Sequence, residues 1–118
     1  MTAAEFRRMA LGLPEAVESS HMGHADFRVG GKIFATLGYP GDRFAVVMLS
    51  PQDQDLMVKD YPKVFAPVSG SWGASGSTTI LLRAARKRAV AIALEGAWRK
   101  RAPKKAAAAL DRASQRGV

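Results

Sequence analysis

Residues that favour β-structure occur in two short runs, 26–29 and 32–37, separated by two glycines. Glycine readily adopts the positive φ angles that a two-residue hairpin turn requires, so this pattern predicts a β-hairpin. Antiparallel pairing across the turn would place Val29 opposite Lys32, Arg28 opposite Ile33 and Phe27 opposite Phe34. One face of the predicted hairpin then carries Phe27, Val29, Phe34 and Lys32, and the other carries Arg28, Ile33, Ala35 and Leu37. Neither face is wholly polar, so we expect both to be partly covered.

Three segments have the apolar spacing and the end signals of α-helices. A capping box of threonine and glutamate predicts a helix over 3–11. Ser50 as the cap, followed by proline in the first position, predicts a helix over 51–60. The longest helix is expected over 83–101, with Pro103 to stop or kink it. Its apolar face is predicted to contain Ala85, Ala89, Ile92, Ala93 and Gly96.

The remaining extended segments complete a small sheet. They are predicted at 14–24, 43–49, 64–68 and 77–82. The run that contains Pro67 should lie at an edge, because proline cannot donate a ladder hydrogen bond. The glycine-rich segment Gly70–Gly76 is expected to be a flexible loop. The predicted fold class is α+β, with an antiparallel sheet of about five strands and the element order α-β-β-β-α-β-β-α.

The chain has room for one domain with a modest core, since it has 118 residues of which 47% are hydrophobic. We expect this domain over residues 1–105, followed by a basic tail over 106–118 that is frayed from Asp111 onward. Cysteine is absent, which excludes disulfides and thiolate chemistry. The sequence has neither an apolar run of membrane-span length nor a signal peptide, so we expect a cytoplasmic monomer without membrane contact or cofactor.

The net charge of +8 is concentrated in the C-terminal third of the chain. Residues 1–82 carry seven Lys and Arg against eight Asp and Glu, a balance of −1, whereas residues 83–118 carry eleven against two, a balance of +9. Such a basic block raises the local concentration of polyanions such as nucleic acid and makes their binding strongly salt-dependent. The alternative is a solvated basic helix end that only aids solubility.

The densest basic segment is Trp98–Arg101, continued by Lys104 and Lys105. Cations at the C-terminal end of a helix are favoured by its dipole, but five within seven residues exceed that need. An aromatic ring beside arginine and lysine is also how proteins grip phosphate backbones and single strands, which makes Trp98 a candidate contact.

His21, His24 and Asp26 are the one cluster that resembles a metal or general-base site. In a continuous strand, residues 21 and 24 would point to opposite faces, so a turn at Gly23 is needed to bring them together. No third strong ligand can be identified, and local hydrogen bonding at the hairpin entry is the favoured interpretation.

The glycine-rich segment around Trp72 is no phosphate-binding loop, because it lacks the Gly-Lys-Ser/Thr ending and leads into a strand. Trp72 is expected to be a core anchor, with an exposed stacking ring as the alternative. The serines are not surrounded by a nucleophile elbow, and the paired acids Asp53 and Asp55 are explained by helix capping. The sequence therefore shows no catalytic constellation and disfavours an enzyme without excluding one.

Several segments together resemble the MmcQ/YjbR family over about residues 2–105. They are Leu13-Pro-Glu-Ala-Val-Glu18, the hairpin Asp26-Phe-Arg-Val-Gly-Gly-Lys-Ile-Phe-Ala35, Val64-Phe-Ala-Pro67, Gly70-Ser-Trp-Gly73, and Ala97-Trp98 followed by Ala102-Pro103. The resemblance implies an α+β fold similar to CyaY-like proteins and to a double-wing DNA-binding motif. Small bacterial members are usually labelled DNA-binding on that similarity, and no agreed catalytic residues can be carried over.

The leading hypothesis is a DNA-binding protein that contacts the phosphate backbone with little sequence preference. Its predicted contact residues are Arg28, Lys32, Arg43, Arg99, Lys100, Arg101, Lys104 and Lys105. The alternative is a non-catalytic interaction module that binds a protein or a small molecule on the face of the sheet, with Trp72 at its rim. One continuous basic surface joining the hairpin to the C-terminal helix would favour DNA, and scattered cations would favour the module.

Overall fold

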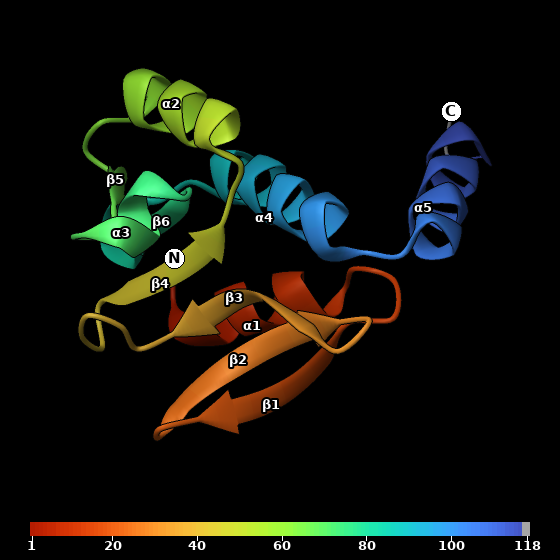
Figure 1. Cartoon of the computed structure of the whole chain (residues 1–118), viewed down its shortest axis with the longest axis horizontal. Coiled ribbons are helices and arrows are strands. Elements are labelled where there is room, and N and C mark those ends of the chain that lie inside the picture. Colours follow the sequence, from red (N-terminus) through yellow and green to blue (C-terminus); the bar gives the residue numbers. More distant parts are fainter. Residues whose placement is uncertain (117–118) are drawn as a thin grey trace.

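The computed structural model describes the backbone of residues 1–116 and the side chains of residues 1–113. Six strands form one antiparallel sheet in the order β1-β2-β3-β4-β6-β5 (Figure 1). The strands are β1 Val17–His21, β2 His24–Val29, β3 Lys32–Leu37, β4 Phe44–Met48, β5 Phe65–Pro67 and β6 Ser77–Leu81. The helices are α1 Ala3–Leu11, α2 Pro51–Asp60, α3 Ser71–Ala74, α4 Lys87–Arg101 and α5 Lys104–Arg116, with a short 3₁₀-helix at Leu82–Ala84.

The predicted α+β class and antiparallel sheet are confirmed, and the sheet has one strand more than the predicted five. Strand β1 lies within the extended segment predicted at 14–24, which the predicted element order did not count, and it forms one edge of the sheet with none of its five residues buried. Because this strand has no alternation of apolar and polar residues, the sequence placed its bounds only loosely. The opposite edge is β5, as predicted from Pro67.

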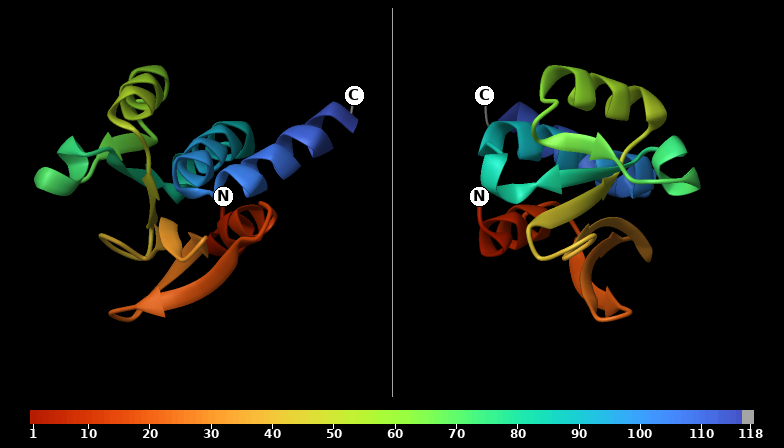
Figure 2. Two further views of the ribbon diagram at one scale, coloured as in Figure 1. Left: turned by 45° about the vertical axis from the view of Figure 1, so that its right-hand side comes forward. Right: turned by 90° about the vertical axis from the view of Figure 1, so that its left-hand side faces the viewer.

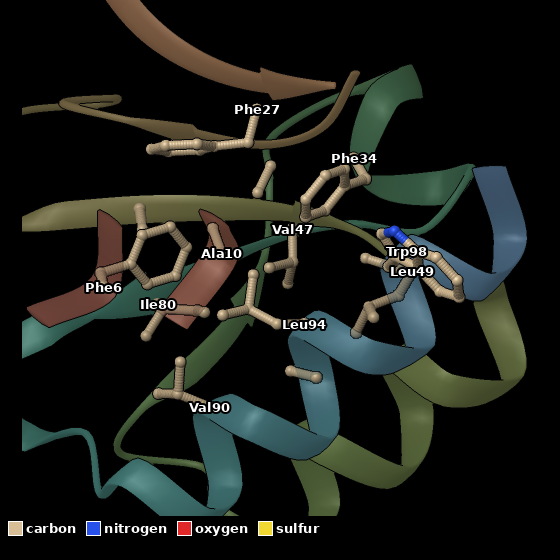
Figure 3. Close-up of a cluster of buried hydrophobic side chains, with 14 of the residues drawn as sticks. Phe6, Ala10, Phe27, Phe34, Val47, Leu49, Ile80, Val90, Leu94 and Trp98 are labelled. Atoms are coloured by element: carbon tan, nitrogen blue, oxygen red, sulfur yellow. The ribbon is translucent and has the colours of Figure 1, made fainter. Parts of the chain in front are cut away.

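The core lies between one face of the sheet and the helices α1 and α4 (Figure 3). Phe6 on α1 packs edge-on against Phe27 on β2, with ring centroids 6.1 Å apart. Val90, Leu94 and Trp98 project from α4 toward the strands. Figure 2 shows α3 on the other side of the sheet from α1 and α4, so that face is covered only at its margin.

The predicted hairpin is confirmed, but its register shifts after two residue pairs. Val29 pairs with Lys32 and Arg28 with Ile33, as predicted. A bulge then leaves Phe34 as an extra residue, so that Phe27 pairs with Ala35 instead. The extra residue resets the alternation of side chains, and the predicted face of Ala35 and Leu37 is therefore wrong. Both are buried in the core together with Phe27, Val29 and Phe34.

The first two helices have the predicted bounds, whereas α4 begins four residues later than predicted. Thr2 and Glu5 form the capping box of α1, and the Ser50 side chain accepts from the backbone N–H of Asp53 at the start of α2. The chain makes a 3₁₀ turn before α4 that buries Leu82 and Ala85, and this inward turn replaces the predicted first helical turn.

The buried face of α4 differs from the predicted one. It consists of Ala89, Val90, Ala93, Leu94, Ala97 and Trp98. Ile92 was predicted to lie on the buried face and is instead 51% exposed. A helix rich in alanine offers two apolar faces, and packing against β3 and β4 selects one of them.

Pro103 separates α4 from α5, in agreement with the predicted stop. Ala106 on α5 is only 1% exposed and belongs to the core, which holds the first turn of α5 against the domain. The helix continues to Arg116, so the predicted fraying does not begin at Asp111. Residues 117–118, also predicted to be frayed, lie outside the described residues. None of the helices within residues 1–116 combines the length and apolar character needed to cross a membrane.

Candidate functional site

The tip of the β2–β3 hairpin packs against the junction between α4 and α5. A Cβ atom added at Gly30 would lie 3.1 Å from both Cγ and Cδ of Pro103, so the two turns are in close contact. Lys32 follows Gly30 by two residues, and Lys104 follows Pro103 directly. This contact brings the backbones of two cation-bearing segments, about seventy residues apart in sequence, to one corner of the molecule.

We call this surface the basic corner. It consists of Lys32, Arg101, Lys104 and Lys105. The three lysines are exposed and Arg101 is partly buried. None of the four forms an ion pair with the described part of the chain, so their charge is available to a partner.

Arg28 was a predicted contact residue, but its positive charge is compensated by the carboxylate of Asp26 in the same domain. Its Nε donates to Oδ1 of Asp26 at 2.8 Å and its Nη2 to Oδ2 at 3.0 Å. The Asp26 side chain is fully buried and also accepts from His21 Nδ1 at 2.8 Å. Hydrogen bonds from Arg28, and secondarily from His21, hold the pKa of Asp26 below its ordinary value against the opposing effect of burial.

Three other residues predicted to contact DNA either bind groups within the protein or lie away from the basic corner. Arg99 donates to Asp111 at 2.8 Å and lies 3.8 Å from Glu95. Lys100 donates to the carbonyl oxygen of Leu49 at 2.9 Å, and burial, followed by the charge of Arg101, lowers the pKa of Lys100. Arg43 is exposed in the β3–β4 loop, at the end of β3 remote from the hairpin tip. Four of the eight predicted cations are therefore brought together.

A pocket of about 630 Å³ adjoins the corner on the face of the sheet that α1 and α4 leave open. Its floor is formed by side chains from β3, β4 and β6, namely Ile33, Thr36, Val46, Met48 and Ser77. Trp72 lines one side, and His21, His24 and Tyr39 line another. Arg101 belongs to both the pocket lining and the basic corner, which makes the two features contiguous.

Comparison with known families identifies the group to which this fold belongs. A sequence profile of the family described as YjbR matches residues 11–100. The chain belongs to the YjbR family. A comparison with curated protein sequences gives no match.

Solved structures similar to this YjbR-family chain include one from Deinococcus radiodurans. It is the crystal structure of protein DR2400, which contains a DUF419 domain. The sequences are 17% identical, the TM-score is 0.67, and the alignment covers 82% of this chain and 75% of that one. This likeness establishes the shared fold. The family match ends at residue 100, so three of the four cations of the basic corner follow the matched segment.

The two tryptophans of this YjbR-family chain lie in opposite environments. Trp98 is completely buried, and its Nε1 donates to the carbonyl oxygen of Pro14 at 3.0 Å, so it is a core residue and no phosphate contact. For Trp72 a core anchor was favoured and an exposed ring at the rim of the sheet face was the alternative; the ring is 66% exposed at the pocket, which agrees with the alternative. Residue type alone could not separate the two, because burial depends on what packs against each ring.

The glycine-rich segment that carries Trp72 has a defined, closely packed backbone. It forms the single helical turn α3, whereas a flexible loop was predicted. A Cβ at Gly73 would collide with the carbonyl group of Val68, and one at Gly76 with that of Leu49. The buried Gln54 amide donates to the carbonyl oxygens of Gly73 and Ser77 at 2.9 and 3.1 Å. The close backbone approach explains these glycines and fixes α3 over the edge of the pocket.

His21 and His24 face each other across the β1–β2 turn, with ring centroids 6.5 Å apart. The turn required at Gly23 is present, with positive φ at Met22 and Gly23. Within the described residues no three His, Cys, Asp or Glu side chains converge as metal ligands, and Asp26 is already occupied by Arg28 and His21. The favoured interpretation, local hydrogen bonding at the hairpin entry, is confirmed for His21 and Asp26.

Sequence reasoning missed the Asp26–Arg28 ion pair, although the signal for it was present. Residues i and i+2 of a strand point to the same face, so an Asp-x-Arg sequence within a strand places opposite charges side by side. The pocket residues Ile33, Thr36 and Met48 gave no signal, because the face they occupy depends on the bulge and on the order of the strands.

Proposed function

We propose that this YjbR-family protein binds the phosphate backbone of DNA at the basic corner, with little sequence preference. The observation that supports the proposal is the contact between Gly30 and Pro103, which brings the hairpin turn that precedes Lys32 beside the start of α5, where Lys104 and Lys105 lie. Lysine and arginine contacts to phosphate position a protein on the duplex and carry no sequence information. The proposed form is a cytoplasmic monomer that needs no cofactor.

The distribution of carboxylates supports the same surface. Of the two acidic residues after residue 82, Glu95 and Asp111, both lie within ion-pair distance of Arg99. Their negative charge therefore compensates Arg99 and leaves the lysines of the corner without a partner in the described residues. A locally uncompensated cationic surface raises the concentration of a polyanion at that surface.

The test compares two variants of equal net charge in fluorescence anisotropy with a labelled random-sequence duplex. Lys104→Gln/Lys105→Gln removes two charges from the corner. Arg83→Gln/Arg88→Gln removes two exposed charges near the other end of α4. We expect the first variant to weaken binding by about tenfold or more at moderate salt and the second to weaken it much less. Equal weakening would show that net charge alone drives binding, and no binding by the parent protein would refute the proposal outright.

A further inference from the structure

The sheet-face pocket has the dimensions of a small-molecule site. Its volume of about 630 Å³ lies within the range of roughly 300 to 1,000 Å³ that is typical of ligand pockets. Its floor is mainly apolar, with Ile33, Val46 and Met48 beside the hydroxyl-bearing Thr36 and Ser77. The helices that bury the other face of the sheet leave this one open (Figure 2). An apolar hollow with a few polar groups at its margin is the usual form of a binding site for an organic ligand.

Exposed apolar side chains gather around this pocket. Among the described residues, seven large apolar side chains are exposed, and three of them line it: Met22, Tyr39 and Trp72. Trp72 is held in place by α3, whose backbone is fixed by Gln54 and by the close approach of Gly73 to Val68. An exposed indole carried on this fixed backbone at the edge of an apolar hollow offers a flat surface on which a planar ring can stack.

The charge at the pocket selects for an anion. Arg101 lines the pocket, and its Nε is buried without a hydrogen-bond partner in the described structure. No carboxylate is among the lining residues, and nearby Asp26 is fully buried and held by Arg28 and His21. A guanidinium group without a carboxylate partner beside an apolar cavity favours one acidic group on the ligand.

We propose that the sheet-face pocket binds a small, flat aromatic molecule that carries a single acidic group. Its ring lies on the floor of Ile33 and Met48 against Trp72, and its acidic group pairs with Arg101. This inference does not depend on DNA binding, because the floor and the aromatic wall lie outside the basic corner. The two surfaces share only Arg101.

The test uses two fluorescent dyes of similar shape, the anion anilinonaphthalene sulfonate and the uncharged phenylnaphthylamine. Both are titrated into the whole protein and into the variants Trp72→Ala and Arg101→Gln. Trp72→Ala should weaken both dyes by about tenfold, because it removes the aromatic wall. Arg101→Gln should weaken the anionic dye by about tenfold and leave the neutral dye unchanged, because it removes one charge-assisted contact.

Two controls separate this pocket from other surfaces. Ile92→Ala removes an exposed apolar side chain that lines a smaller hollow of about 240 Å³ between α2 and α4. Lys104→Gln/Lys105→Gln weakens the proposed DNA surface. Both variants should bind the dyes as the parent protein does. The inference is overturned if the parent protein binds neither dye, or if Trp72→Ala binds both dyes as tightly as the parent does. It is also overturned if Arg101→Gln binds the anionic dye as tightly as the parent, or if Ile92→Ala loses dye binding.

Discussion

The number of cations in the basic corner predicts how steeply salt weakens DNA binding. Each neutralised phosphate of duplex DNA contributes about 0.9 to the slope of log affinity against log salt. The four cations of the corner, Lys32, Arg101, Lys104 and Lys105, therefore give a slope of about −3.6. All eight cations predicted from the sequence would give about −7.2.

These slopes correspond to large and easily separated changes in affinity. A fourfold rise in salt, from about 50 to about 200 mM, lowers affinity by about 150-fold for a slope of −3.6 and by about 20,000-fold for −7.2. In Lys104→Gln/Lys105→Gln the slope should fall to about −1.8, which makes the same change about 12-fold. The assay is fluorescence anisotropy on one random-sequence duplex at four or more salt concentrations.

The decisive variant is Arg28→Gln, because sequence and structure disagree about this residue. The Arg28 guanidinium is bound to the buried Asp26 carboxylate, so its removal should leave the salt slope unchanged. The variant will be less stable, since Asp26 loses its main partner, and binding must be measured where circular dichroism shows it folded. A slope flattened by about 0.9 in Arg28→Gln, or a parent slope near −7, would refute the assignment of contacts.

Three further predictions concern the packing that supports the site, and each is measured by chemical denaturation. Asp26→Asn should lower stability at neutral pH. The pKa of Asp26 is lower in the folded state, so the parent protein should lose stability as the pH falls below about 4, and Asp26→Asn should lose less in this range. Trp98→Phe should cost about 1–3 kcal/mol, because it leaves a cavity and the Pro14 carbonyl group without its donor. Gly73→Ala should cost about 1–3 kcal/mol or more, since the added methyl group collides with the Val68 backbone.

These three predictions have distinct failure criteria. An unchanged acid transition in Asp26→Asn would show that other carboxylates set the acid stability. A Trp98→Phe protein as stable as the parent would mean that neither the lost ring volume nor the hydrogen bond to Pro14 contributes measurably to stability. A stable Gly73→Ala protein with unchanged tryptophan fluorescence would mean that α3 tolerates movement, which would also weaken the argument that Trp72 is rigidly mounted.

Features that depend on neighbouring residues were determined by the sequence itself. The capping box predicted the start of α1, Ser50 and the following proline predicted α2, and the Gly30–Gly31 pair predicted the hairpin. In each case a few adjacent residues satisfy or forbid local backbone hydrogen bonds and φ angles. The same local motifs carried the family resemblance, which the profile match confirms over residues 11–100.

Features that depend on contacts between distant segments were decided only by the tertiary structure. The bulge at Phe34, the buried face of α4 and the opposite fates of Trp72 and Trp98 each depend on which surface packs against which. Burial of an apolar side chain is favourable wherever it occurs, so composition alone does not choose among alternative faces.

For the charged residues too, the sequence determined the total charge and the tertiary structure determined its placement. The sequence by itself determined that the C-terminal third is strongly basic. Only the folded chain decided that Arg28 and Arg99 are paired with carboxylates, while Lys32 joins Lys104 and Lys105 at one corner. Electrostatic energy depends on the distance between charged groups, and the fold brings together residues that the sequence separates.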